Sequence, residues 1–156
     1  MTGRLIGIAR HDRSRGPIEV VDRVAVTRTA GVAGDHRGAA APGTTGKRQV
    51  TLIEAESWIA AMHSLAEQGT AAIDWHDRRA NLLIEGLRLP REAGRVIAIG
   101  ASLRIETTVE CAPCSRMDDI APGLRAALTP DWRGGVCGRV LDDGEIAVGD
   151  EARIES

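Results

Sequence analysis

Short runs of alternating apolar and polar residues, separated by turn-forming residues, occupy most of this chain. The runs that predict strands are 5–9, 18–26, 50–53, 82–84, 95–109 with a break at Gly100, 136–141, 146–148 and 152–154. Such alternation is typical of strands with one buried face. Many short strands with glycine-rich turns predict a mainly β protein, and we expect its sheet to close into an antiparallel barrel.

One segment, residues 54–68, has helical periodicity instead. Its apolar residues recur at three- and four-residue spacing and predict one buried face, formed by Ala55, Trp58, Ile59, Met62, Leu65 and Ala66. Glu54 and Glu56 suit the N-terminal end of a helix, and Gly69 supplies a C-terminal stop. A second short helix is predicted around Leu124 and Leu128. We therefore expect one or two helices packed on the barrel.

The amino-acid composition limits the kinds of partner that this protein is expected to bind. A chain of 156 residues predicts a single domain, 1–156, with its own core. Phe and Tyr are absent and the net charge is -2, so neither a base-stacking platform nor a field that attracts nucleic acid or an anionic membrane is expected. No apolar run is long enough to span a membrane, and the N-terminal residues lack the apolar stretch of a signal peptide. The odd number of three cysteines favours a reducing compartment, so we expect a cytoplasmic protein.

Candidate chemistry is concentrated in Cys111-Ala112-Pro113-Cys114, at the end of a predicted strand. Pro113 cannot donate to a sheet, so the strand should stop there and Cys114 should project from a loop. Arg116 follows closely and favours the thiolate form of Cys114. We expect Cys111, which is nearer the strand, to be a packed and passive thiol, and Cys137 to be a small core residue.

The C-x-x-C pair has several interpretations. A structural zinc site needs a second ligand pair, which the sequence lacks. A thioredoxin-like redox pair needs a helix that follows the strand in a βαβ unit, whereas the predicted context is β. Two interpretations stay open: a thiolate that ligates a soft metal or carries sulfur, and a pair of inert buried thiols.

Further polar residues stand at the ends of other predicted strands. Asp35-His36-Arg37 follow a glycine-rich stretch, Lys47-Arg48 precede the strand at 50–53, and Arg79 and Asn81 precede the strand at 82–84. Adjacent cations can bind a phosphate, but charged turns and charge-protected edge strands are equally compatible with the pattern. Residues 39–46, rich in Gly, Ala, Thr and Pro, predict a surface loop.

Taken in order, these motifs resemble the MOSC family, named for the C-terminal domain of eukaryotic molybdenum-cofactor sulfurases. The stretch 31–36 resembles the family's G-x-x-G-D-x-H stretch, and 79–86 is similar to its R-x-N-hydrophobic-x-G motif. Pro113-Cys114 matches the proline-cysteine pair that holds the family's key thiol, and 135–150 resembles its closing turn and hairpin. The resemblance covers most of the chain.

The resemblance implies a barrel similar to that of pyruvate kinase and a protein that binds the molybdenum cofactor (molybdopterin) or transfers sulfur. The role of the family cysteine falls on Cys114, as metal ligand or catalytic thiol. Arg79 and Asn81 match positions placed against the cofactor in relatives. The remaining candidates for cofactor binding are Asp35, His36, Lys47, Arg48 and Arg116, whose cations suit the cofactor's phosphate. We expect these residues to meet in one cleft.

Three functions follow from this resemblance. The first is an oxidoreductase that reduces small N-hydroxylated substrates, with electrons from a separate protein because the sequence has no ferredoxin-type cysteine cluster. The alternative is a sulfur carrier that bears a persulfide on Cys114, loaded by a sulfur donor, for assembly of a metal-sulfur cofactor. The third is a non-catalytic module that binds a phosphate-bearing ligand.

Overall fold

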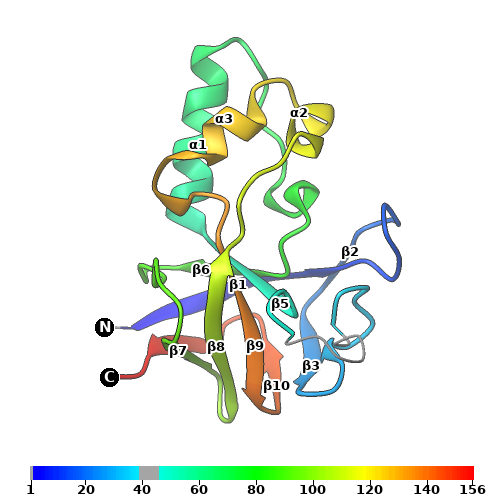
Figure 1. Cartoon of the computed structure of the whole chain (residues 1–156), viewed down its shortest axis with the longest axis vertical. Helices are drawn as coiled ribbons and strands as arrows, with labels where there is room; N and C mark the ends of the chain where they lie inside the picture. Colours follow the sequence, from blue (N-terminus) through cyan, green and yellow to red (C-terminus); the bar gives the residue numbers. More distant parts are fainter. Residues whose placement is uncertain (1, 39–45) are drawn as a thin grey trace.

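Seven strands close into a barrel because the first strand pairs with the last (Figure 1). The structure, a computed structural model, describes residues 2–38 and 46–156. Around the barrel the strands are β1 (Thr2–Arg10), β6 (Leu82–Glu85), β5 (Val50–Glu54), β9 (Val136–Asp142), β8 (Leu103–Glu110), β7 (Val96–Ile99) and β11 (Glu151–Ile154). The prediction of a mainly β chain with a closed barrel is confirmed.

One pair of neighbouring strands is parallel, so the prediction of a purely antiparallel barrel is wrong in this respect. In β5 and β6, Leu52 lies beside Leu82 and Glu54 beside Ile84. The connection between these strands contains α1 (Ala55–Glu67) and the 3-10 helix η1 (Trp75–Arg78), which gives the crossover length that parallel neighbours need. Residue alternation shows which face of a strand is buried, but it does not show the direction of its neighbour.

The remaining strands lie outside the closed barrel. β2 (Glu19–Val21) pairs with β1, while β3 (Arg23–Thr27), β4 (Gly31–Val32) and β10 (Gly144–Ala147) form a small antiparallel sheet. The turns between these strands bring the segments around His11 and Asp35 together, since the backbone N–H of His36 donates to the carbonyl of His11 over 2.6 Å. The surface loop predicted for 39–46 lies outside the described residues except for Gly46.

The helices gather at one end of the barrel, where α1 packs against α3 (Leu124–Leu128) and α2 (Arg116–Ile120) packs against α3 (Figure 1). The buried residues of α1 are Trp58, Ala61 and Leu65. The predicted face is therefore partly wrong: Ile59 is 55% exposed and Ala66 is exposed as well. Helical periodicity alone cannot show which sides of α1 the neighbouring elements cover.

Two apolar clusters share strands β5 and β6. Leu52 and Leu82 point into the barrel, while their neighbours Ile53 and Leu83 point outward against the helices. This opposite orientation follows from the two-residue period of a strand. β5 and β6 thereby fix the helical layer to the barrel. The segments that follow η1 and β8 are held in place with this layer.

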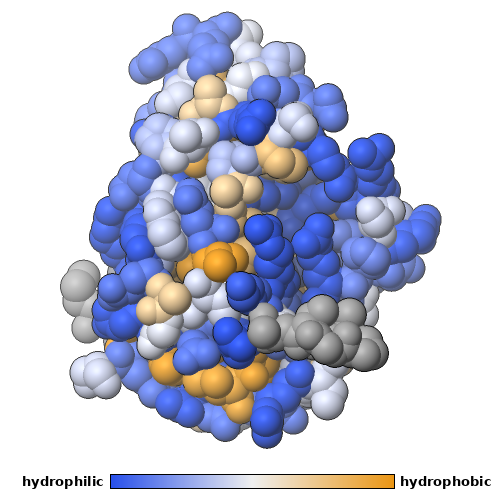
Figure 2. Space-filling view, viewed as in Figure 1, coloured by the Kyte–Doolittle hydropathy of each residue, from blue (hydrophilic) through white to orange (hydrophobic). Residues whose placement is uncertain are grey.

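The face shown in Figure 2 is mainly hydrophilic, with smaller apolar groups and one larger group near its lower end. The exposed large apolar side chains of the described residues, Val20, Ile59 and Val148, belong to β2, α1 and the turn after β10. Within 2–38 and 46–156, no helix combines the length and apolar character required to cross a membrane.

Candidate functional site

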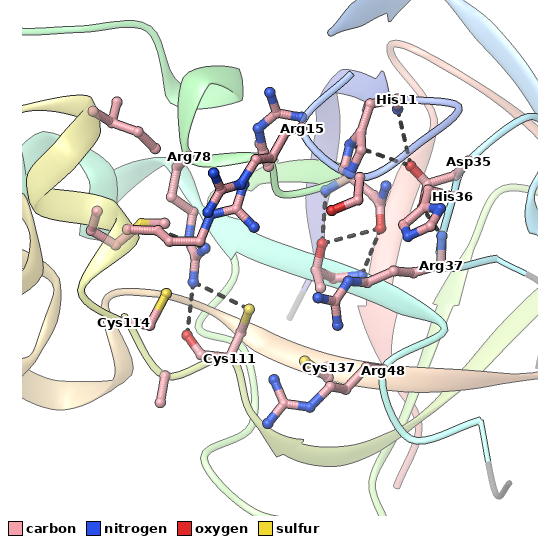
Figure 3. A pocket seen from close by; sticks show the side chains of 18 of the residues that line it. His11, Arg15, Asp35, His36, Arg37, Arg48, Arg78, Cys111, Cys114 and Cys137 are labelled. Atoms are coloured by element: carbon pink, nitrogen blue, oxygen red, sulfur yellow. Dashed lines mark hydrogen bonds and ion pairs between the residues drawn. The ribbon is translucent and has the colours of Figure 1, made fainter. Parts of the chain in front are cut away.

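A cleft of about 360 Å³ opens beside the helical layer, where the segments after β1, η1 and β8 meet (Figure 3). All three cysteines line it. Six arginines line it as well: Arg15, Arg37, Arg48, Arg78, Arg79 and Arg116. The carboxylates of its lining are Asp35 and Asp119, so the cleft is strongly cationic although the whole chain carries a net charge of -2.

The cleft contains every predicted site residue except Lys47. Lys47 is exposed, and its backbone carbonyl accepts a hydrogen bond from the Thr108 hydroxyl. The side chain of its neighbour Arg48 does line the cleft. The structure thus brings together predicted residues from four separate segments of sequence, and their roles stay predictions.

Cys114 is exposed and free, directly before α2. Its backbone carbonyl accepts the N–H of Met117 over 2.9 Å, so the turn that begins α2 also holds this cysteine in place. An exposed thiol on a structured turn can ligate a soft metal or carry sulfur without moving the strands.

Arg79 has a strained backbone and an unsatisfied donor. Its φ of 70° lies in the left-handed region, which non-glycine residues adopt at a cost of about 1–3 kcal/mol. The N–H of Arg79 donates to the carbonyl of His76 over 2.8 Å, which helps to hold this conformation. Its buried Nη1 has no hydrogen-bond partner among residues 2–38 and 46–156. The guanidinium therefore has a donor available for an anionic ligand in the cleft.

Asn81 lines the cleft, but most of its side chain is used to join strands. Its Oδ1 accepts from the N–H and hydroxyl of Thr51 at 3.0 and 3.1 Å, and its Nδ2 donates to the carbonyl of Ala9 at 3.1 Å. Asn81 is 4% exposed. It therefore connects β1 and β5 beneath the cleft.

Replacement of Asn81 by alanine should reduce the free energy of unfolding by about 2–3 kcal/mol, because it leaves a buried N–H and a buried carbonyl without partners. Urea denaturation measures this change. Gln68→Ala, which removes an exposed amide at the end of α1, is the control and should change stability by less than about 0.5 kcal/mol. Equal effects of both substitutions would contradict the bridging role.

Asp35 holds two walls of the cleft together. Its Oδ1 accepts the N–H of His11 over 3.1 Å, and its Oδ2 accepts the N–H of Arg37 over 3.3 Å. The rings of His11 and His36 lie 6.2 Å apart. Burial lowers the pKa of His11 despite the nearby Asp35, so a neutral imidazole faces the cleft at neutral pH.

Arg78 is a functional candidate that the sequence pattern does not distinguish from its neighbour Arg79. It is 6% exposed, and its Nη2 donates to the carbonyl and to the Sγ of Cys111 at 2.8 and 3.1 Å (Figure 3). Its Nε donates to the carbonyl of Gly134 over 3.1 Å. A buried guanidinium between two loops distant in sequence is a tertiary feature without a local signal.

Cys111 is packed, as expected, but it does not lie in an apolar environment. A hydrogen bond from Cys137 and the charge of Arg78 lower the pKa of Cys111 to about 6, against the opposing effect of burial. The same hydrogen bond, together with burial, raises the pKa of Cys137. Cys111 therefore carries the thiolate of this pair.

The described residues contain no group of three or more His, Cys, Asp or Glu side chains arranged to hold a metal ion. The cleft instead offers one exposed thiol and an excess of cations. Such a donor set suits a metal that arrives in an anionic cofactor with its own ligands better than a bare ion.

Comparisons with known proteins agree with this architecture. The family model for the MOSC domain matches residues 29–153. The structure resembles the YUAD protein from Bacillus subtilis (19% identity, TM-score 0.79, 100% of this chain and 97% of that chain) and YiiM from Escherichia coli (15%, 0.68, 98% and 70%). It also resembles YiiM from Geobacillus stearothermophilus (16%, 0.63, 99% and 73%). At these identities the structural likeness shows the fold alone, and a comparison with curated proteins gave no match.

Proposed function

Because this chain belongs to the MOSC domain family, we propose that its cleft binds the molybdenum cofactor, with the Cys114 thiolate as the protein ligand of molybdenum. The observation that carries the proposal is the presence of an exposed thiol and six arginines in one cleft. Molybdopterin carries a phosphate and soft sulfurs, so its site requires a soft ligand for the metal and cations for the phosphate.

The residues of the cleft fit this group. Arg79 offers its buried, unpaired Nη1 to a phosphate oxygen, and Arg48 and Arg116 are further cations of the lining. A donor that is already buried loses little hydration on binding, so its hydrogen bond to an anion contributes more than one at the surface. Cys114 supplies the soft ligand.

The reaction class that we propose is the reduction of N-hydroxylated compounds, in which the N–O bond breaks and water leaves. When bound, molybdenum supplies the two-electron chemistry, and a separate protein supplies the electrons. The reduction also consumes two protons. His11 and His36 line the cleft and can relay protons, because a neutral imidazole accepts a proton at one nitrogen before it gives one up, and Asp35 fixes the backbone of the segment that carries His11.

A second candidate is a sulfur carrier with a persulfide on Cys114. The exposure of this free thiol favours it, since a donor protein must reach the sulfur, and the surrounding arginines favour a persulfide anion. The two candidates differ in what the purified protein holds: molybdenum in the first, and one additional sulfur atom on Cys114 in the second.

Metal analysis of protein from a molybdenum-replete host tests the proposal, and a persulfide-specific label tests the alternative. Arg79→Gln should lower the molybdenum content roughly tenfold, because a charge-assisted hydrogen bond from a buried donor contributes about 1.5–3 kcal/mol. Arg88→Gln is the matched control, since Arg88 is an exposed arginine paired with Asp131 and lies outside the cleft lining. Parent protein without molybdenum but with labelled Cys114 would replace the first candidate by the second.

A further inference from the structure

Two of the cleft cysteines form a buried pair that the proposed function does not use. Cys111 follows β8 and Cys137 lies in the adjacent β9, two residues after Gly135, whose carbonyl accepts the N–H of Cys111 over 2.9 Å. Cys111 is 8% exposed and Cys137 is fully buried, yet both contribute to the lining of the cleft. Part of the Cys111 residue is therefore exposed at the wall of the cleft.

The buried guanidinium of Arg78 requires a negatively charged group beside it. The guanidinium is 6% exposed, and no carboxylate of the described residues lies within ion-pair distance of it. A buried cation without a counter-charge is strongly destabilising. The ionised sulfur of Cys111, 3.1 Å from Nη2, supplies that charge, and Arg48 and Arg37 add to the positive potential around it. The thiolate is the nucleophilic form of cysteine.

We propose that Cys111 is a nucleophile that reacts with small hydroperoxides in the cleft, and that Cys137 then forms a disulfide with it. This inference does not depend on the cofactor proposed above. The Cys111 thiolate attacks one oxygen of hydrogen peroxide, the O–O bond breaks, hydroxide leaves, and a sulfenic acid forms on Cys111. Cys137 attacks the sulfenic sulfur, the S–S bond forms, and the S–O bond breaks. The proton of Cys137 leaves with the oxygen as water, so two sulfurs are oxidised and one peroxide is reduced.

The position of Cys137 makes it the resolving residue. It lies two residues after Gly135, the backbone partner of Cys111, and lines the same cleft, whereas Cys114 is exposed and held by the turn before α2. Disulfide formation removes the negative charge opposite Arg78. The oxidised cleft is therefore more cationic than the reduced cleft, and its affinity for an anionic ligand should rise.

The test uses the full chain with Cys114→Ser, so that only the buried pair remains. One equivalent of hydrogen peroxide at pH 7 should remove two hydrogens from the intact mass, and peptide mapping should join the peptides of Cys111 and Cys137. With Cys137→Ala added, dimedone should trap a sulfenic acid on Cys111. Mapping of the oxidised parent protein should give the same disulfide. A disulfide between Cys111 and Cys114 in the parent, or no oxidation of Cys111, would overturn the proposal.

Arg78 variants test the origin of the reactivity. Arg78→Gln should slow the peroxide reaction at pH 7 about tenfold, because less of Cys111 is ionised, while Arg78→Lys should keep most of the rate. Arg88→Gln, at an exposed arginine outside the cleft lining, should leave the rate unchanged. Circular dichroism verifies the fold of each variant. With Arg78 and both buried cysteines unchanged, the rate of the peroxide reaction should fall as the pH decreases through about 6, because Cys111 then takes up a proton. A midpoint near the ordinary cysteine value of about 8.5 overturns the proposal even if Arg78→Gln does not fold.

Discussion

Replacement of Cys114 by serine should reduce the molybdenum content of the protein to less than about a tenth of the parent value, because a hydroxyl is a poor ligand for a soft metal. Loss of a residue that only orients a ligand already costs about 10–100-fold in metal affinity, and loss of the ligand itself should cost at least as much. Cys114 is exposed, so the change from sulfur to oxygen creates no buried cavity. The midpoint of thermal unfolding should therefore stay near that of the parent.

Cys111→Ser is the informative comparison for this variant. It makes the same sulfur-to-oxygen change in the same C-x-x-C segment, but at a cysteine that is 8% exposed and accepts a hydrogen bond from Arg78. We expect it to keep most of the molybdenum and to lose stability instead, because Arg78 then lacks its counter-charge. Elemental analysis and thermal denaturation of both variants separate these outcomes. Equal loss of molybdenum in both would indicate a dithiol mechanism, and full retention in Cys114→Ser would exclude this thiol as the ligand.

Gly135→Ala should lower the free energy of unfolding by about 3–5 kcal/mol, through two effects that add together. Gly135 has a φ of 102°, which an alanine adopts only with strain. A Cβ at this position would also lie 2.2 Å from the carbonyl oxygen of Leu52, and this oxygen belongs to a barrel strand and cannot move away easily. The carbonyl of Gly135 accepts the N–H of Cys111, so the displacement would extend to the cleft.

Gly149→Ala provides a matched control for this prediction. Gly149 has nearly the same φ, 105°, but a Cβ there would have no atom within 4 Å. Gly149→Ala should therefore lower the free energy of unfolding by the backbone strain alone, about 1–2 kcal/mol. Chemical denaturation of the two variants measures the difference, and a difference below about 1 kcal/mol would show that β5 accommodates the new methyl group.

Local patterns predicted the strands and the main helix well because burial on one face leaves a periodic signal. Runs such as 50–53 and 82–84 correspond to β5 and β6 within one or two residues. The parallel arrangement of these strands left no such signal, since it depends on the path of the chain between them. The periodicity also places Ile59 on the buried face of α1, but this residue is 55% exposed, because burial depends on which sides of a helix its neighbours cover.

The candidate site was predictable where the resemblance to a family marked individual positions, as for Cys114 and Arg79. It was not predictable where the chemistry arises from packing. Arg78 and Cys111 are 33 residues apart, and only the folded chain places a buried guanidinium 3.1 Å from a thiol. Asn81 was expected to face a cofactor, whereas most of its hydrogen-bonding atoms connect strands. A sequence motif identifies that a polar residue matters, but not which of its atoms are already paired.

The pairing of β1 with β11 has a consequence for folding during synthesis. Residues 2–4 of β1 find their partners at 151–153, almost the whole length of the described chain away. The barrel therefore cannot close before residues 151–153 have been synthesised, and residues 2–4 of β1 and the outer edge of β7 stay unpaired until then. Contacts of such long sequence separation form slowly, and open strand edges attract other chains. A nascent chain arrested before residue 151 should accordingly be a strong substrate for chaperones that cover exposed β edges.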